Sequence, residues 1–248
     1  MFTLIAGCCV IESEDLTLRI ADRLVGMCYD LNLPLIFKAS YRKANRTSVR
    51  SFTGIGDEAG LEILAKVGRT FGVKVTTDVH SAHEAVVAAR YVDVIQIPAF
   101  LSRQTDILTA AGDTGKTVNI KKGQFMSAAA TYEAVAKIRR GRNENIWITE
   151  RGNSFGYEDV VIDYRNIPML KAAGVPVFVD ITHTNGDKWA VSQTLGACAI
   201  AAGADGIFLE THPDPFTALS DPMKMIPLSA LPDILKKLIN VKTVTNER

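Results

Sequence analysis

Two groups of side chains in this sequence could carry chemistry, and the first group is cationic. Its members fall at or shortly after the ends of short apolar segments and are Lys38, Lys43, Arg46, Lys121 and Arg151, with Arg103 nearby. Gathering several cations at one site is unfavourable unless anions pair with them. Guanidinium forks and ammonium groups both suit phosphate and carboxylate. The cationic group therefore predicts a substrate with more than one anionic group.

The second group consists of potential metal ligands, which are Cys9, His183, Glu210 and Asp221. A thiolate, an imidazole and two carboxylates favour a borderline divalent ion, Zn²⁺, Fe²⁺ or Mn²⁺, over Mg²⁺ or Ca²⁺. Their spacing forms no compact motif, so it leaves open both a metal site and a set of polar strand ends in water. The neighbouring Cys8 should point the opposite way along a strand and pack in the core.

These residues need a scaffold that brings distant parts of the chain together. Near-continuous apolarity over a few residues is typical of parallel strands buried on both faces, which helices must connect. Such segments occur at residues 3–7, 35–40, 73–79, 92–98, 117–121, 146–150, 175–181 and 206–210. Helix starts follow, as where Ser13 precedes Glu14 and Asp15, and where Ser81 precedes Glu84. The chain therefore alternates strands and helices.

Eight strand and helix units in 248 residues predict an α/β fold, a (β/α)₈ TIM barrel forming one domain over residues 1–248. An open doubly wound sheet is the alternative. A barrel gathers its C-terminal strand ends on one face, where Asp78, His80, Gln96, Asp180 and His212 also fall. By strand alternation Lys122 should be solvated or structural. Cys28 and Cys198 lie on apolar helix faces, which predicts burial.

Composition narrows the environment and the partners. With 28 Lys+Arg against 27 Asp+Glu the net charge is +1, so no charge excess favours nucleic acid or an anionic membrane. No apolar run approaches the roughly 18 residues of a membrane span, and the first residues lack the charged flank of a signal peptide. Four cysteines, two of them adjacent, do not suggest a disulfide scaffold. We expect a cytoplasmic protein with neither nucleic-acid nor membrane partners.

Several strings, in order from Ala6 to about Leu235, resemble a known enzyme family. The most specific are Lys43-Ala-Asn-Arg46, Pro98-Ala-Phe-Leu-Ser-Arg-Gln-Thr-Asp106, Asn119-Ile-Lys-Lys-Gly-Gln-Phe125, Asp180-Ile-Thr-His183 and Glu210-Thr-His-Pro-Asp-Pro215. They are similar to the 3-deoxy-D-manno-octulosonate 8-phosphate synthases, also called 2-dehydro-3-deoxyphosphooctonate aldolases. The resemblance implies a barrel enzyme, usually a homotetramer, that condenses phosphoenolpyruvate with D-arabinose 5-phosphate and water and releases inorganic phosphate. The product feeds lipopolysaccharide biosynthesis.

The resemblance also implies which residues bind the two substrates. Those expected to hold or neighbour the phosphoenolpyruvate phosphate and carboxylate are Lys121, Arg151, Lys43, Ser40 and Lys38, with Gln96 lining the pocket. Those expected to receive the sugar phosphate are Asn45, Arg46 and Thr47, together with Arg103 from a neighbouring subunit.

Catalysis, by the same resemblance, depends on charge stabilisation and one proton transfer. Lys43, Lys121 and Arg151 would stabilise charge at the reacting carbon and the aldehyde oxygen. His183, Asp221 or metal-bound water would move the proton. Metal-dependent members carry Cys at the position of Cys9, and metal-independent members carry Asn. The resemblance therefore places this chain in the metal-dependent class, with Cys9, His183, Glu210 and Asp221 as ligands.

The departures from the family lie on the acceptor side. Arg42 stands where relatives usually have an acid, Thr53 where they usually have Arg, and the loop after His183 is short. One alternative is therefore a related 3-deoxy-heptulosonate 7-phosphate synthase using another aldose phosphate, such as erythrose 4-phosphate, although the Lys-Ala-Asn-Arg string argues against it. A Schiff-base aldolase using Lys38 or Lys121 and a non-catalytic phosphate-binding protein are two further alternatives.

Overall fold

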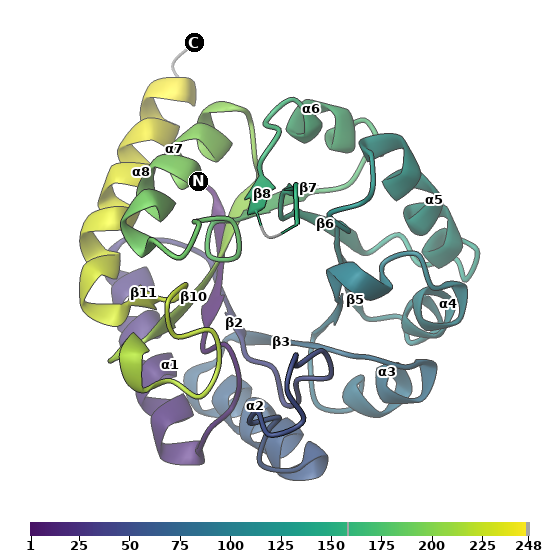
Figure 1. The fold of residues 1–248 in the computed structure, drawn as a ribbon, viewed down its shortest axis with the longest axis horizontal. Helices are drawn as coiled ribbons and strands as arrows, with labels where there is room; N and C mark the ends of the chain where they lie inside the picture. The colour runs from purple at the N-terminus through teal and green to yellow at the C-terminus, as the bar shows by residue number, and fades with distance from the viewer. Residues whose placement is uncertain (158, 247–248) are drawn as a thin grey trace.

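Eight parallel strands close into a barrel in the computed structural model, which describes residues 1–157 and 159–246 (Figure 1). The barrel strands are β1 (Thr3–Gly7), β2 (Leu35–Lys38), β3 (Lys74–Asp78), β4 (Val94–Ile97), β5 (Thr117–Lys121), β6 (Ile146–Glu150), β9 (Val177–Asp180) and β10 (Gly206–His212). β1 pairs with β2 on one side and with β10 on the other, from Thr3 opposite Gly206 to Gly7 opposite Glu210. This closure confirms the predicted (β/α)₈ barrel, and the open doubly wound sheet is wrong.

Helices surround the barrel on the outside (Figure 1). They are α1 (Glu14–Asp30), α2 (Asp57–Phe71), α3 (Ala82–Ala88), α4 (Thr105–Asp113), α5 (Ala128–Arg139), α6 (Asn166–Lys171), α7 (Ser192–Ala201) and α8 (Leu231–Asn246). The predicted helix starts are confirmed, since Ser13 Oγ accepts the N–H of Leu16 and Ser81 Oγ accepts the N–H of Glu84. Among the described residues, no helix has the length and apolar character needed to cross a bilayer.

Apolar side chains fill two regions, as the strand pattern requires. Ile5, Ile36, Phe178 and Phe208 form a small cluster, with Trp147 packed against it. The larger cluster contains alternate strand residues and the buried helix faces, so it lies between strands and helices. Close contact between β1 and β2 requires Gly7, because a Cβ there would clash with the carbonyl oxygen of Lys38.

Several short elements lie outside the regular alternation. They are the antiparallel strands β7 (Asn153–Phe155) and β8 (Asp159–Val161), the two-residue strand β11 (Ile226–Pro227) beside β10, and the 3-10 turns η1 (Ala99–Leu101), η2 (Trp189–Val191), η3 (Pro215–Thr217) and η4 (Leu228–Ala230). All follow C-terminal strand ends, where the loops of a barrel build its site. The β7–β8 hairpin directly follows β6, which is the strand that precedes Arg151.

The cysteine predictions are partly confirmed. Cys8 and Cys28 are buried as expected, but Cys198 is exposed, so its predicted burial is wrong. The buried face of α7 contains Gly196, Ala199 and Ile200. Cys198 lies two residues from Gly196, about 200° around the helix, and therefore faces away from the core.

Candidate active site

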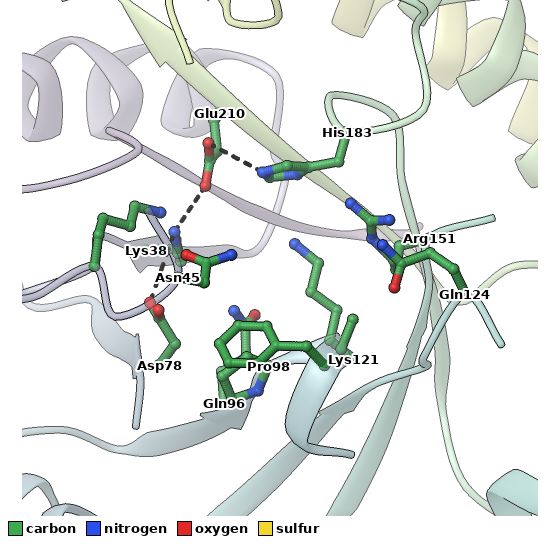
Figure 2. Close-up of a pocket in the computed structure, with 13 residues that line it drawn as sticks. Lys38, Asn45, Asp78, Gln96, Pro98, Lys121, Gln124, Arg151, His183 and Glu210 are labelled. Carbon is green, nitrogen blue, oxygen red and sulfur yellow. Dashed lines mark hydrogen bonds and ion pairs between the residues drawn. The ribbon is translucent and has the colours of Figure 1, made fainter. Parts of the chain in front are cut away.

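A pocket of about 410 Å³ opens where the C-terminal ends of the barrel strands meet. The predicted site residues that line it are Lys38, Lys43, Asn45, Gln96, Lys121, Arg151, His183 and Glu210. Figure 2 shows these side chains approaching one space from several strands and loops. Lys38 and Glu210, for example, are 172 positions apart in the chain and yet hydrogen-bonded.

The four other residues expected to bind substrate do not line this pocket: two of them make hydrogen bonds close to it, and two are exposed. Ser40, whose Oγ hydrogen-bonds to Lys38 and Asp78, is buried behind the pocket wall. Arg46 bonds to Ser220 and lies 4.0 Å from Asp221. Thr47 and Arg103 are exposed and line no part of this pocket. Arg103 instead lines a separate groove along α5.

One side of the pocket carries two cations, the buried Lys121 and the partly buried Arg151, beside Gln124 (Figure 2). Lys121 Nζ lies 2.5 Å from Asp180 Oδ2 and 3.8 Å from the centre of the Phe208 ring. Burial lowers the pKa of Lys121 and of Arg151, and the charge of Asp180 opposes that effect at both. Two desolvated cations at one wall form a strong site for a phosphate group.

The opposite side is organised by Lys38, which is fully buried. Its Nζ lies 2.7 Å from Glu210 Oε1 and 3.9 Å from Asp78 Oδ1 (Figure 2). It also lies 3.0 Å from Ser40 Oγ. Burial raises the pKa values of Asp78 and Glu210, but Lys38 and the other cations and hydrogen-bond donors around them together outweigh burial and hold both pKa values below their usual range. These neighbours, with Lys38 the strongest, therefore keep two carboxylates ionised at this side of the pocket.

His183 is held between two carboxylates. Its Nδ1 lies 2.8 Å from Asp180 Oδ2, and its Nε2 lies 3.6 Å from Glu210 Oε2. Asp180 Oδ1 accepts the backbone N–H groups of Thr182 and His183, each at 2.9 Å. Because Asp180 is an acceptor at Nδ1, that nitrogen carries a proton and Nε2 faces Glu210 and the pocket.

Cys9, Glu210 and Asp221 form a group whose ligand atoms all lie within 4.8 Å of one another. Glu210 Oε2 is buried with no hydrogen-bond partner among the described residues, which is unfavourable unless a cation or donor binds it. Cys9 Sγ lies 3.2 Å from Asp221 Oδ2. His183 lies beside this group, with its Nε2 3.6 Å from Glu210 Oε2. A thiol, two carboxylates and a nearby imidazole therefore fit a divalent metal.

In the absence of a bound metal ion, the thiol of Cys9 is protonated. Burial, with the charge of Glu210, raises the pKa of Cys9 above its usual range. Metal binding would release that proton, because the thiolate is the ligand. Asp221 has a left-handed backbone, with a φ of 46°, which Asp and Asn tolerate better than most other residues.

Sequence reasoning left several pocket residues without a role. The sequence places Asp78 only at a strand end and gives no reason to expect Gln124 or Phe100 in the pocket, and it does not show that Asp180 contacts the lining residues Lys121 and His183. The available signal for Gln124 is its place three residues after Lys121. Lys122 is fully buried, so the solvated alternative for this residue is wrong and the structural one is confirmed.

A second network supports Asp78 from outside the pocket. His80 Nε2 lies 3.2 Å from Asp78 and its Nδ1 lies 3.0 Å from Glu84, which also binds Tyr41 and Arg42. Arg42, the residue that replaces the usual acid, is paired with Glu84 and Asp57. Burial lowers the pKa of His80, but hydrogen bonds to Asp78 and Glu84 outweigh it and raise the pKa to about 9.

His80 therefore predicts a pH-dependent contribution to stability. Since its folded pKa of about 9 exceeds the ordinary 6.5, the stabilisation is fully present below pH 6.5 and is lost as the pH rises through 9. The difference in unfolding free energy between wild type and His80→Gln should shrink by about 3 kcal/mol from about pH 6 to pH 10. Urea unfolding at both pH values measures it.

Tyr41→Phe is the matched control for this measurement. It removes the hydroxyl that bonds Glu84 and leaves the imidazole in place, so it should lower stability without changing the slope with pH. If the difference in unfolding free energy between wild type and His80→Gln stayed constant from pH 6 to pH 10, His80 would not be held in its charged form.

Comparisons with known proteins identify the family of this chain. A family model described as the DAHP synthetase I family matches residues 1–247. The 2-dehydro-3-deoxyphosphooctonate aldolase of Trichlorobacter lovleyi is 48% identical over 248 residues, covering 96% of this chain and 91% of the relative. Those of Citrifermentans bemidjiense and a Cyanothece species are 47% and 44% identical, covering 98% of this chain and 93% and 92% of the relatives. The chain belongs to the DAHP synthetase I family.

Proposed function

We propose that this protein condenses phosphoenolpyruvate with D-arabinose 5-phosphate and water, giving 3-deoxy-D-manno-octulosonate 8-phosphate and inorganic phosphate. The observation that carries the proposal is the pocket that Lys121 and Arg151 line together with Glu210, which also belongs to the Cys9, Glu210 and Asp221 group. The names of the relatives, at 44% to 48% identity over nearly the full chain, favour this acceptor. A cytoplasmic location and a role in lipopolysaccharide biosynthesis are part of the same proposal.

In the proposed reaction, C3 of phosphoenolpyruvate attacks the aldehyde carbon, water adds at C2, and the C2–O bond to phosphate breaks. Lys121 and Arg151 bind the phosphate, and Lys43 binds the carboxylate from the loop that follows β2. Holding both substrates in one pocket replaces a bimolecular encounter with an oriented one. Charge developing at C2 and at the leaving phosphate is stabilised by these three cations.

His183 is suited to moving the proton in this reaction. Asp180 fixes its Nδ1, so Nε2 remains either to exchange a proton with a group in the pocket or to bind the metal, but not both at once. Asp221 is the second candidate, because its carboxylate lies beside Cys9 Sγ. The chemistry supplied by a divalent ion held by Cys9, His183, Glu210 and Asp221 is Lewis-acid polarisation of the aldehyde oxygen. Zn²⁺, Fe²⁺ and Mn²⁺ are the ions that this donor set favours.

The acceptor phosphate is assigned to Asn45, Arg46 and Thr47, on the loop after β2. Asn45 lines the pocket and Arg46 bonds to Ser220 beside Asp221, which supports a location for the sugar at this side. Arg103 lies outside the pocket of its own chain, so its proposed contact with the phosphate requires a second copy. We therefore include a homotetramer in the proposal.

The decisive assay is phosphate release from phosphoenolpyruvate with each of two acceptors. We expect a kcat/KM at least about tenfold higher with arabinose 5-phosphate than with erythrose 4-phosphate, because hydroxyl contacts in the pocket discriminate between sugars. Each acceptor without phosphoenolpyruvate is the control. A preference for erythrose 4-phosphate would favour the heptulosonate alternative, and no release with either sugar would favour a phosphate-binding protein.

A further inference from the structure

A buried ion pair lies behind Lys121 and Arg151, the two cations proposed to bind the phosphate of phosphoenolpyruvate. Lys122 and Glu150 are both fully buried, with Lys122 Nζ 3.4 Å from Glu150 Oε1. Each of them directly adjoins a pocket residue, since Lys122 follows Lys121 and Glu150 precedes Arg151. Successive residues of a strand point to opposite faces, so Lys122 points away from the pocket that Lys121 lines. The proposed mechanism uses neither member of the pair.

The ammonium group of Lys122 joins two separate loops. On the β5–α5 loop its Nζ lies 3.2 Å from Gly123 O and 3.3 Å from Met126 O. On the segment after β6 it lies 3.4 Å from Gly152 O and 3.0 Å from Asn153 Oδ1. The first loop carries Gln124 and the second begins with Arg151, both of which line the pocket. One charge therefore joins the two segments that carry these pocket residues.

Glu150 completes the attachment on the other side of Arg151. Its Oε1 accepts the N–H of Gly152 at 2.6 Å, and its Oε2 accepts Asn166 Nδ2 at 3.1 Å. Gly152 has a φ of 83°, and a Cβ at this position would lie 3.3 Å from Thr184, so the turn after Arg151 favours glycine. The residues before and after Arg151 are thus both fixed by the same carboxylate.

We propose that the Lys122–Glu150 pair positions Arg151 and Gln124 for the phosphate of phosphoenolpyruvate. The inference rests on the proposed function. A buried ion pair is weak evidence for stability, because an uncharged replacement of similar shape is often neutral or stabilising. Removing both charges together can therefore separate positioning from stability. Lys122 and Glu150 are positioning residues, since neither of them lines the pocket.

The test uses the double variant Lys122→Met/Glu150→Gln, which removes both charges and keeps similar shapes. We expect its melting temperature to stay within about 5 °C of wild type. The KM for phosphoenolpyruvate and the Kd for inorganic phosphate should rise at least about tenfold, while the KM for the sugar phosphate stays within about twofold. Lys122→Met alone should lose stability as well, because Glu150 is then buried without a partner.

Lys171→Met/Asp205→Asn is the matched control, because it removes an ion pair of 2.8 Å that lies outside the active-site pocket. It should change neither KM nor Kd. If the main double variant fails to fold, Asn153→Ala removes one acceptor of Lys122 and the bond to Met126, and should raise the same KM about threefold. Unchanged phosphoenolpyruvate and phosphate affinities in folded variants would overturn this inference alone. Wild-type protein that binds neither molecule would overturn the proposed function with it.

Discussion

Lys121→Ala is expected to lower kcat/KM for phosphate release by about 10³-fold, because it removes a preorganised cation from the point where charge develops. Lys121 Nζ is buried against Asp180 and the Phe208 ring and lines the pocket. The fold should persist, since Asp180 keeps its bonds to His183 and to two backbone N–H groups. Phosphate release and thermal melting monitored by circular dichroism measure the two effects.

Lys237→Ala, on the exposed face of α8, is the control for Lys121→Ala and should retain wild-type activity. An active Lys121→Ala enzyme with unchanged affinity for phosphoenolpyruvate would remove Lys121 from the phosphate site. The Schiff-base alternative is tested on wild type with borohydride, which traps a substrate imine covalently. We expect no trapped adduct by mass spectrometry, because the proposed reaction requires no covalent intermediate.

The barrel could be predicted because its strands are buried on both faces and therefore apolar along their length. All eight predicted strands are present in the structure; four of them are two or three residues shorter than predicted, and β10 is two residues longer. The β7–β8 hairpin was not predicted, because Asn153–Phe155 and Asp159–Val161 are too short and too exposed to show a pattern. The exposure of Cys198 could not be predicted for a different reason. Helix α7 is apolar on both faces, so its sequence alone does not show which face is buried.

The residues of the site could be predicted from their places at strand ends, but the hydrogen bonds and ion pairs between them could not. Lys38 has the residue type of a substrate ligand, yet its ammonium is bound to Glu210, Ser40 and the carbonyl of Cys9. Strand alternation separates Lys121 from its neighbour Lys122, but only the structure shows that Lys122 pairs with Glu150 and bonds to the loops behind the pocket. Pairings of this kind depend on strand register, which residue spacing does not encode.

Loss of the metal is expected to abolish activity, and Cys9 is the residue that tests this most directly. Cys9, Glu210 and Asp221 place a sulfur and carboxylate oxygens within 4.8 Å of one another, and His183 adds an imidazole through its contact with Glu210. Exhaustive chelation should reduce activity at least about 100-fold, and Mn²⁺, Zn²⁺ or Fe²⁺ should restore it to differing extents. The protein should retain the metal ion less tightly at low pH, because the ligands bind it in their deprotonated forms.

Substitutions at Cys9 separate a ligand from a packed thiol. Cys9→Ser should retain at least about tenfold less metal after dialysis, because a hydroxyl is a much poorer ligand than a thiolate, and elemental analysis measures this without any assay of activity. Cys28→Ser, at a buried cysteine on α1, is the matched control and should keep its metal.

Asp221→Asn keeps a residue type that tolerates the φ of 46° and removes the charge, so a loss of metal there reports the carboxylate rather than backbone strain. Cys9→Asn reproduces the residue expected in the metal-independent class, and we expect it to bind no metal. Full activity in wild-type protein that elemental analysis shows to be metal-free would instead mean that Cys9 only packs against Ser220 and Asp221. In that case the buried oxygen of Glu210 that lacks a hydrogen-bond partner would have to face substrate, and the proton transfer would fall to His183 and Asp221 alone.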